Sequence, residues 1–300
     1  MGCAALARVT FAEEWRPDIA VPAPHDRPPA RQGWLVVGAS VAGWRHRERN
    51  VPCQDAHLIH RLPTGELLIA VADGAGRAAS AADAARSTTA RAVASLQRIM
   101  QAPPRQAAHW PGVLRGVFGD VREELARRAG LAQVELRAFS TTLTTVIVAA
   151  DWLVVGQVGD GAVVAQDTAG ACWLAAPPQN GETMRHTDHV TAPEALPALD
   201  VQVYPPVPAL AVTTDGLLPL ALARTSAAPR FPRQYAPAPG FFQPLLEYAA
   251  TATDPRWAER DLAGFLASER VCARTGDDKT LVLAVRRDLP PATMRPAGEP

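Results

Sequence analysis

Five aspartates stand at the ends of apolar runs that are typical of β-strands. In "GELLIAVADGAG" (65–76) the apolar run 67–72 ends on Asp73, and Gly74 and Gly76 follow at once. The same pattern recurs, forwards or reversed, in the stretches 153–166, 210–222, 274–286 and 51–59, which supply Asp160, Asp215, Asp277 and Asp55. Each Asp-Gly pair taken alone predicts only a turn, because Asp and Gly are ordinary turn residues. The recurrence is the informative feature.

Strand ends on a shared sheet edge are places where residues far apart in the chain can converge. Several carboxylates gathered there without enough basic partners would repel one another, and hard divalent cations would relieve that repulsion. Oxygen ligands of this kind suit Mg²⁺ or Mn²⁺ better than zinc. The spacing of the aspartates therefore indicates a divalent-metal site.

Composition and charge exclude several other classes of protein. The chain has 300 residues, with 30 Lys and Arg against 30 Asp and Glu, so its formal net charge is zero. This balance does not indicate a nucleic-acid partner or a polybasic membrane surface. The four cysteines form no CxxC pair, so neither a structural zinc site nor a disulfide framework is indicated. No apolar run approaches the ~18 residues that span a bilayer. We expect a cytoplasmic protein.

The first half of the chain alternates between strand and helix patterns. We expect a Pro-rich, loosely ordered extension over 1–32, a strand over 34–43 and a hairpin over 58–73 that turns at 63–65. Helical periodicity then predicts one helix that begins at Ser80 as its N-cap and ends before Pro103, and a second that presents Leu114, Val117, Phe118, Val121 and Leu125 on one face.

The second half is predicted to return to strands. We expect an antiparallel meander over 141–150, 152–160 and 162–167, extended by 172–176, and then a loop over 177–208. A strand over 209–214, a helix over 216–224, an irregular insertion over 226–240, helices over 241–250 and 255–268, and a last strand over 280–285 follow, before a disordered tail over 289–300. Runs of strands separated by runs of helices favour an α+β fold with antiparallel sheets.

The order of the motifs resembles a known family. "PCQDA", "VADGAG", "STTL", "GQVGDG", "TTDG" and "TGDDKTL" occur in the order seen in the metal-dependent protein phosphatases of the PP2C type, and most closely in their bacterial subgroup. The likeness runs over about residues 34–286. It implies one phosphatase domain over 33–288, built as a four-layer αββα sandwich of two antiparallel sheets flanked by helix pairs.

The resemblance also implies a site. Asp73 matches the family's aspartate that bridges two divalent ions, and Gly74 matches the residue whose carbonyl binds one of them. Asp215 and Asp277 match further ligands, and Asp55 matches the aspartate that holds the metal water shell. Asp160 matches a residue near a third, weaker ion. The implied cofactors are two Mg²⁺ or Mn²⁺ ions, with a possible third.

The implied reaction is hydrolysis of phosphoserine and phosphothreonine in proteins. Two ions can share a hydroxide that attacks phosphorus while they offset the charge of the phosphate oxygens. Asp73 and Asp55 would be catalytic through these ions. The implied partners are phosphorylated proteins, the targets of a serine/threonine kinase.

Three positions depart from the family's pattern. Ala75 stands where many members carry a histidine that serves as a candidate acid. Asn50 falls near the position of a phosphate-binding arginine, so His46 is our candidate for contact with phosphate or for the acid, and a solvated loop is the alternative reading. Asp278 stands where many members have asparagine, and it could either tune the metal or bind nothing.

Two other functions remain open at this point. A phosphatase-like module that binds a partner without turnover would fit the missing histidine and the uncertain arginine. A phosphatase of a small phosphorylated metabolite would use the same metal centre. Every acidic position of the implied centre is present, so a loss of activity is not indicated. Hydrolysis of phosphoproteins is our leading hypothesis.

Overall fold

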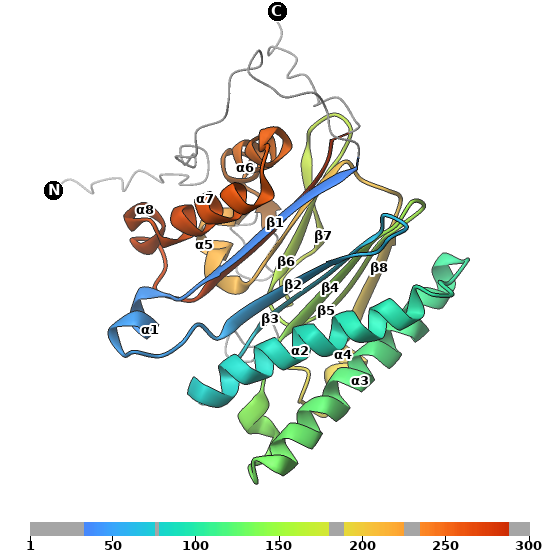
Figure 1. Cartoon of the computed structure of the whole chain (residues 1–300), viewed down its shortest axis with the longest axis vertical. Helices are drawn as coiled ribbons and strands as arrows, with labels where there is room; N and C mark the ends of the chain where they lie inside the picture. The colour runs from blue at the N-terminus through green and yellow to red at the C-terminus, as the bar shows by residue number, and fades with distance from the viewer. Residues whose placement is uncertain (1–32, 76–77, 180–188, 225–234, 288–300) are drawn as a thin grey trace, which may run out of the picture.

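The computed structural model describes residues 33–75, 78–179, 189–224 and 235–287 of the chain (Figure 1). Two five-stranded sheets form its centre, and all neighbouring strands in each sheet are antiparallel. The first sheet has the order β1 (Trp34–Val41), β12 (Lys279–Arg286), β9 (Ala209–Thr213), β6 (Ala162–Gln166) and β7 (Cys172–Ala176). The second has the order β2 (Asp55–Arg61), β3 (Leu67–Asp73), β4 (Leu143–Val148), β5 (Leu153–Val158) and β8 (Asp200–Tyr204).

A pair of long helices covers the outer face of each sheet (Figure 1). α2 (Ala78–Ile99) and α3 (Trp110–Leu131) pack on the second sheet, and α6 (Pro239–Thr251) and α7 (Pro255–Ala267) pack on the first. The shorter elements are helices α1 (Trp44–Glu48), α4 (Ala195–Ala198), α5 (Leu218–Ala221) and α8 (Glu269–Cys272), 3₁₀ turns η2 (Ala107–His109), η3 (Leu136–Phe139) and η4 (Asp215–Leu217), and a hairpin of β10 (Leu222–Arg224) with β11 (Tyr235–Pro237).

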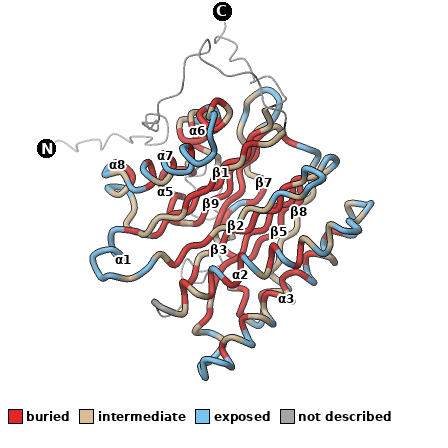
Figure 2. The backbone as a smooth tube through the Cα atoms, in the orientation of Figure 1, coloured by how far each residue is buried: buried red, intermediate tan, exposed pale blue. Residues whose placement is uncertain are grey.

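The sequence of β3 shows why the layers form. Successive side chains of a strand point to opposite faces, and both faces of β3 are apolar. Leu67, Ile69 and Val71 lie in the core between the two sheets, whereas Leu68 and Ala70 lie in the core beneath α2 and α3. Every residue from Leu67 to Ala72 is buried, as Figure 2 shows for the centre of both sheets. A strand buried on both faces holds its terminal aspartate rigidly.

These features confirm the α+β class and the four-layer αββα sandwich. The hairpin of β2 and β3 turns where the sequence predicted, and the expected face of α3 is buried. Among the described residues, none of the helices is long and apolar enough to cross a membrane.

Four predicted elements were wrong. The three-stranded meander does not form: after β5 the chain turns through Gly159, whose φ is +125°, and β6 joins the other sheet beside β9. The predicted loop over 177–208 contains α4 and the edge strand β8, which pairs with β5. Residues 216–224 form a 3₁₀ turn, one short helix and β10 instead of one helix. Ser80 lies inside α2, which begins at Ala78, so it is not the N-cap.

Some predictions fall outside the described residues. These are the extension over 1–32, the tail over 289–300 and most of the insertion over 226–240.

Candidate active site

The antiparallel order of the strands brings the five aspartates to one end of the sandwich. Asp55 opens β2 and Asp73 closes β3, and the two are direct partners in the register of that pair. Asp215 follows β9 and Asp277 precedes β12, the strand that pairs with β9. Asp160 lies in the turn from β5 to β6. Both sheets therefore contribute carboxylates to a shared edge.

The convergence of these carboxylates affects the pKa of Asp73. Burial is the largest cause that raises this pKa well above its ordinary value, and the carboxylates of Asp55, Asp215, Asp277 and Asp160 each raise it further. A carboxylate that interacts electrostatically with four others lies at the centre of an acidic cluster. We call these five residues the aspartate cluster.

Two more members of the aspartate cluster have strongly raised pKa values. Burial raises the pKa of Asp55 to about 8, and the nearby Asp278 and Asp215 add to the shift. Burial also raises the pKa of Asp215 to about 7, with further contributions from Asp160 and Asp277. Among the described residues, no Arg, Lys or His side chain forms an ion pair with Asp55, Asp73 or Asp215.

Threonines fix the orientation of the two facing aspartates. The Oδ2 atom of Asp55 accepts hydrogen bonds from Thr214 Oγ1 at 2.7 Å and from Thr280 Oγ1 at 2.9 Å. The backbone N–H of Asp73 donates to Thr142 Oγ1 at 2.9 Å, and its carbonyl accepts from the Thr142 N–H at 2.8 Å. Each aspartate is thus tied to a neighbouring strand or strand end.

Gly74 is required by close packing against α2. A Cβ atom added at Gly74 would lie 2.2 Å from the Ala81 carbonyl oxygen, a distance that no side chain can tolerate. The Gly74 N–H donates to the Gln54 carbonyl at 3.0 Å. The backbone at Gly74 is therefore held close to the segment that leads into Asp55.

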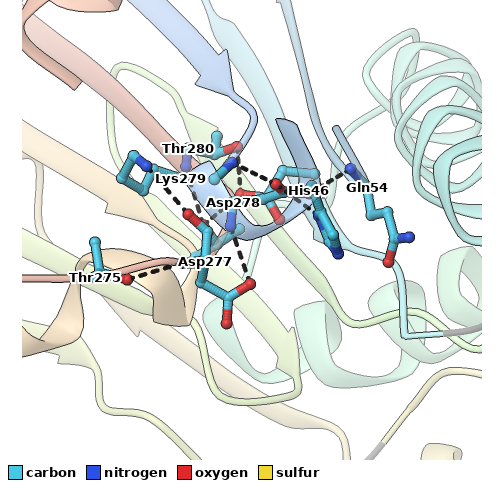
Figure 3. A network of polar contacts seen from close by, with 10 residues as sticks. His46, Gln54, Thr275, Asp277, Asp278, Lys279 and Thr280 are labelled. Carbon is cyan, nitrogen blue, oxygen red and sulfur yellow. Dashed lines mark hydrogen bonds and ion pairs between the residues drawn. The ribbon is translucent and has the colours of Figure 1, made fainter. Parts of the chain in front are cut away.

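Asp278 ties the start of β12 to the loop that carries α1 (Figure 3). Its Oδ1 accepts from the Gly43 N–H at 2.7 Å and contacts His46 Nδ1 at 2.9 Å, and its Oδ2 accepts from the Gln54 N–H at 2.6 Å. Only 3% of the Asp278 side chain is exposed. These contacts rule out the alternative that Asp278 binds nothing, because the side chain serves as a backbone anchor.

Asp277 faces a different set of groups. Its Oδ1 accepts from the Asp278 N–H at 2.9 Å, and its own N–H donates to Thr275 Oγ1 at 3.2 Å. The buried Lys279 donates from Nζ to the Asp277 carbonyl at 3.1 Å (Figure 3). This ammonium group is a positive charge close to the cluster, but it bonds a backbone oxygen rather than a carboxylate.

The donor set fits hard divalent ions, since the cluster offers carboxylate and carbonyl oxygens. As the side chains stand, no group of three or more His, Cys, Asp or Glu within the described ranges could by itself hold a metal ion. The assignment of ligands is therefore a proposal.

Sequence reasoning missed several residues of this edge. Thr214 and Thr280 were not recognised, because threonine is common in any strand. Their position gave the available signal, since each directly adjoins a predicted site element: Thr214 precedes Asp215 and Thr280 follows the Asp277-Asp278-Lys279 run.

Comparisons with known proteins identify the class. The family model described as protein phosphatase 2C matches residues 42–267. The chain is 29% identical over 259 residues to "Serine/threonine-protein phosphatase 3" of Escherichia coli (strain K12), and the match covers 84% of this chain and 98% of that protein.

Solved structures of bacterial phosphatases share the fold. Serine/threonine phosphatase Stp1 from Staphylococcus aureus has a TM-score of 0.56 at 15% identity, covering 85% of this chain and 96% of that one. The S. agalactiae serine/threonine phosphatase has a TM-score of 0.58 at 14% identity, covering 84% and 99%.

The fold and its acidic edge thus define a metal-dependent phosphatase. The family match spans most of the chain, which belongs to the protein phosphatase 2C family. The resemblance that the motifs indicated is confirmed.

Proposed function

We propose that this protein hydrolyses phosphoserine and phosphothreonine in phosphoproteins at a centre that holds two Mg²⁺ or Mn²⁺ ions. The observation that carries the proposal is the convergence of five aspartates from both sheets on one edge, where Asp55 and Asp73 are direct partners in register. Divalent cations would neutralise this excess of negative charge. The serine/threonine phosphatases that the chain resembles support the class of substrate.

The ligands are proposed residue by residue. The carboxylate of Asp73 and the carbonyl of Gly74, at the end of β3, would hold the two ions. Asp215 and Asp277 would complete the ligand set from the first sheet. Asp55 would hold water molecules of the centre, and Asp160 would lie near a third, weaker ion.

When bound, the ions would supply an activated water and offset the charge of the phosphate oxygens. The residues of the chain supply the rigid frame. Asp55 and Asp73 are fixed by hydrogen bonds with threonines, and their burial strengthens every electrostatic interaction at the edge. The leaving oxygen must take a proton from water or from another side chain, since Ala75 cannot donate one.

His46 remains our candidate for contact with phosphate or for the acid. Its Nδ1 lies 2.9 Å from Asp278, and a quarter of its side chain is exposed. Because Nδ1 donates to this carboxylate, Nε2 is the ring nitrogen that remains for contact with a ligand.

Targets of a serine/threonine kinase are the proposed substrates, and a cytoplasmic location stays a prediction. The test is hydrolysis of p-nitrophenyl phosphate and of a phosphothreonine peptide by the whole protein, with Mn²⁺, with Mg²⁺ and with EDTA. The matched variants are Asp73→Asn and, as control, Asp151→Asn, which changes an exposed aspartate in the turn between β4 and β5.

We expect turnover of both substrates that requires metal, disappears in Asp73→Asn and persists in Asp151→Asn. Turnover of the small ester without the peptide would point to a metabolite phosphatase. A folded protein with no turnover under any metal would overturn the proposal in favour of a binding module.

A further inference from the structure

A chain of hydrogen bonds leads away from Asp55 into the sandwich. Thr280 Oγ1, which contacts Asp55 Oδ2, lies 2.7 Å from Ser40 Oγ. Ser40 Oγ in turn lies 2.8 Å from His57 Nδ1. Asp55 and His57 belong to β2 of the second sheet, whereas Ser40 and Thr280 are direct partners across β1 and β12 of the first. This series of hydrogen bonds therefore runs from the second sheet to the first and returns to the second.

The direction of every hydrogen bond in this chain follows from proton counting. Beside bound cations Asp55 would be ionised, and an ionised carboxylate only accepts, so the Thr280 hydroxyl donates its single hydrogen to Asp55. Its oxygen must then accept from Ser40, and the Ser40 oxygen must accept from His57. The proton of the neutral imidazole is thereby placed on Nδ1.

Thr214 closes the arrangement from the other side. Its hydroxyl accepts from the Thr280 N–H at 3.0 Å and donates to Asp55 Oδ2 at 2.7 Å. Oδ2 thus has two hydroxyl donors, while Oδ1 of Asp55 receives no side-chain donor within the part of the chain that the structure describes. The carboxylate is held by one oxygen and can offer the other.

The backbone of β1 makes room for the His57 ring. A Cβ atom added at Gly38 would lie 2.7 Å from Cδ2 and Nε2 of His57. Glycine weakens a strand interior and there marks a close approach by another group. The His57 ring therefore packs directly against β1 at Gly38, two residues before Ser40.

We propose that Ser40 and His57 are positioning residues that orient the Asp55 carboxylate through Thr280, so that Oδ1 serves the metal centre. The inference rests on the proposed function, because it assigns Asp55 to that centre. Partners of this kind fix the geometry of a site, and their loss typically costs about 10–100-fold in metal affinity or activity.

The test compares three removals in the full chain: Thr280→Val, Ser40→Ala and His57→Leu. Thr280→Ser and His57→Asn are the conservative variants, since serine keeps the hydroxyl and asparagine keeps a donor near the Nδ1 position. Thr145→Val is the matched control, because the buried Thr145 hydroxyl donates to the Gly156 carbonyl at 3.3 Å and not to a carboxylate.

Two quantities are measured for each variant. The first is binding of Mn²⁺ alone, followed by the paramagnetic resonance signal of free Mn²⁺. The second is the Mn²⁺ concentration that gives half-maximal hydrolysis of p-nitrophenyl phosphate. Thermal unfolding with EDTA checks that each variant is folded.

We expect both the Mn²⁺ dissociation constant and the half-maximal concentration to rise about tenfold in Thr280→Val and Ser40→Ala, and by several-fold in His57→Leu. The two conservative variants should restore most of the loss, and the control should change less than twofold.

Folded Ser40→Ala and His57→Leu variants with wild-type Mn²⁺ binding and half-maximal concentration would overturn the inference. Equal losses in Thr145→Val would also overturn it, because they would show a general effect of buried hydroxyls. If the wild-type protein binds no Mn²⁺, the proposed function itself has failed, and this outcome is distinguishable from the other two.

Discussion

At the scale of single residues, Asp278 shows why the acidic pair of this chain is Asp-Asp. Its two oxygens face three nitrogen groups, those of Gly43, His46 and Gln54. Asparagine has one acceptor oxygen, so its amide group would confront an N–H donor. We predict that Asp278→Asn lowers the free energy of unfolding by about 1–3 kcal/mol, because a buried donor loses its partner.

Urea unfolding at neutral pH measures this effect. Asp151→Asn, at an exposed turn, is the control and should leave the free energy of unfolding unchanged. A variant at position 278 as stable as the wild type would contradict the anchoring role.

The raised pKa values predict a pH dependence of stability in the metal-free protein. Asp55, with an ordinary pKa of 3.8, titrates at about 8 when folded, and Asp215 titrates at about 7. Each group binds its proton more tightly in the folded state than in the unfolded chain. Its contribution is therefore complete below the unfolded pKa and is lost as pH rises through the folded value.

The expected result is a melting temperature in EDTA that falls as pH rises from about 6 to about 8.5. Millimolar Mn²⁺ should flatten the decline, because binding to the folded state stabilises it at the pH where the carboxylates are ionised. A melting temperature in EDTA that rises across this pH interval would contradict the raised pKa values of Asp55 and Asp215.

At the scale of elements, two glycines predict opposite effects of one substitution. A Cβ atom at Gly216, in η4, would lie 1.9 Å from the Asp278 carbonyl oxygen, whereas one at Gly264, in α7, meets nothing within 4 Å. Gly216→Ala should lower the free energy of unfolding by about 3 kcal/mol or more and weaken Mn²⁺ binding. Gly264→Ala should raise it by about 0.5–1 kcal/mol, because alanine favours a helix interior.

Denaturant titration of both variants decides the matter. A neutral Gly216→Ala would contradict the close packing of η4, which begins at Asp215, against the start of β12.

The elements also show what the sequence could predict. β3 and its Asp73 were predictable because a run buried on both faces is apolar throughout and Asp-Gly punctuates its end. The position of β6 in the first sheet could not be predicted, since a buried strand has the same hydrophobic pattern in either sheet. β8 was missed among prolines, although its "DVQVY" alternates as an edge strand should.

The same distinction applies to the site. Carboxylates at strand ends could be predicted because charge there is unusual, whereas the serine and threonine at positions 40, 214 and 280 are residue types that occur in any strand or turn. The hydrogen bonds that join them span up to 240 positions in sequence. Strand pairing within the first sheet brings those hydroxyls together, and the packing of the two sheets places them against Asp55.

At the scale of the whole molecule, the sandwich serves to gather charge at one edge. Antiparallel order places the end of one strand beside the start of the next, so both sheets supply aspartates to the same end. The surrounding layers bury Asp55 and partly bury Asp73, Asp160 and Asp215, whereas Asp277 is exposed. The mutual repulsion of these carboxylates favours the binding of a proton or a cation.

The most direct test of this account is anomalous diffraction from crystals of the protein grown with Mn²⁺. We predict two strong anomalous peaks that both contact the Asp73 carboxylate, with Asp215 and Asp277 among the ligands of at least one of them. The absence of any peak at Asp73 in crystals saturated with Mn²⁺, or Mn²⁺ bound only elsewhere on the molecule, would contradict the proposed centre.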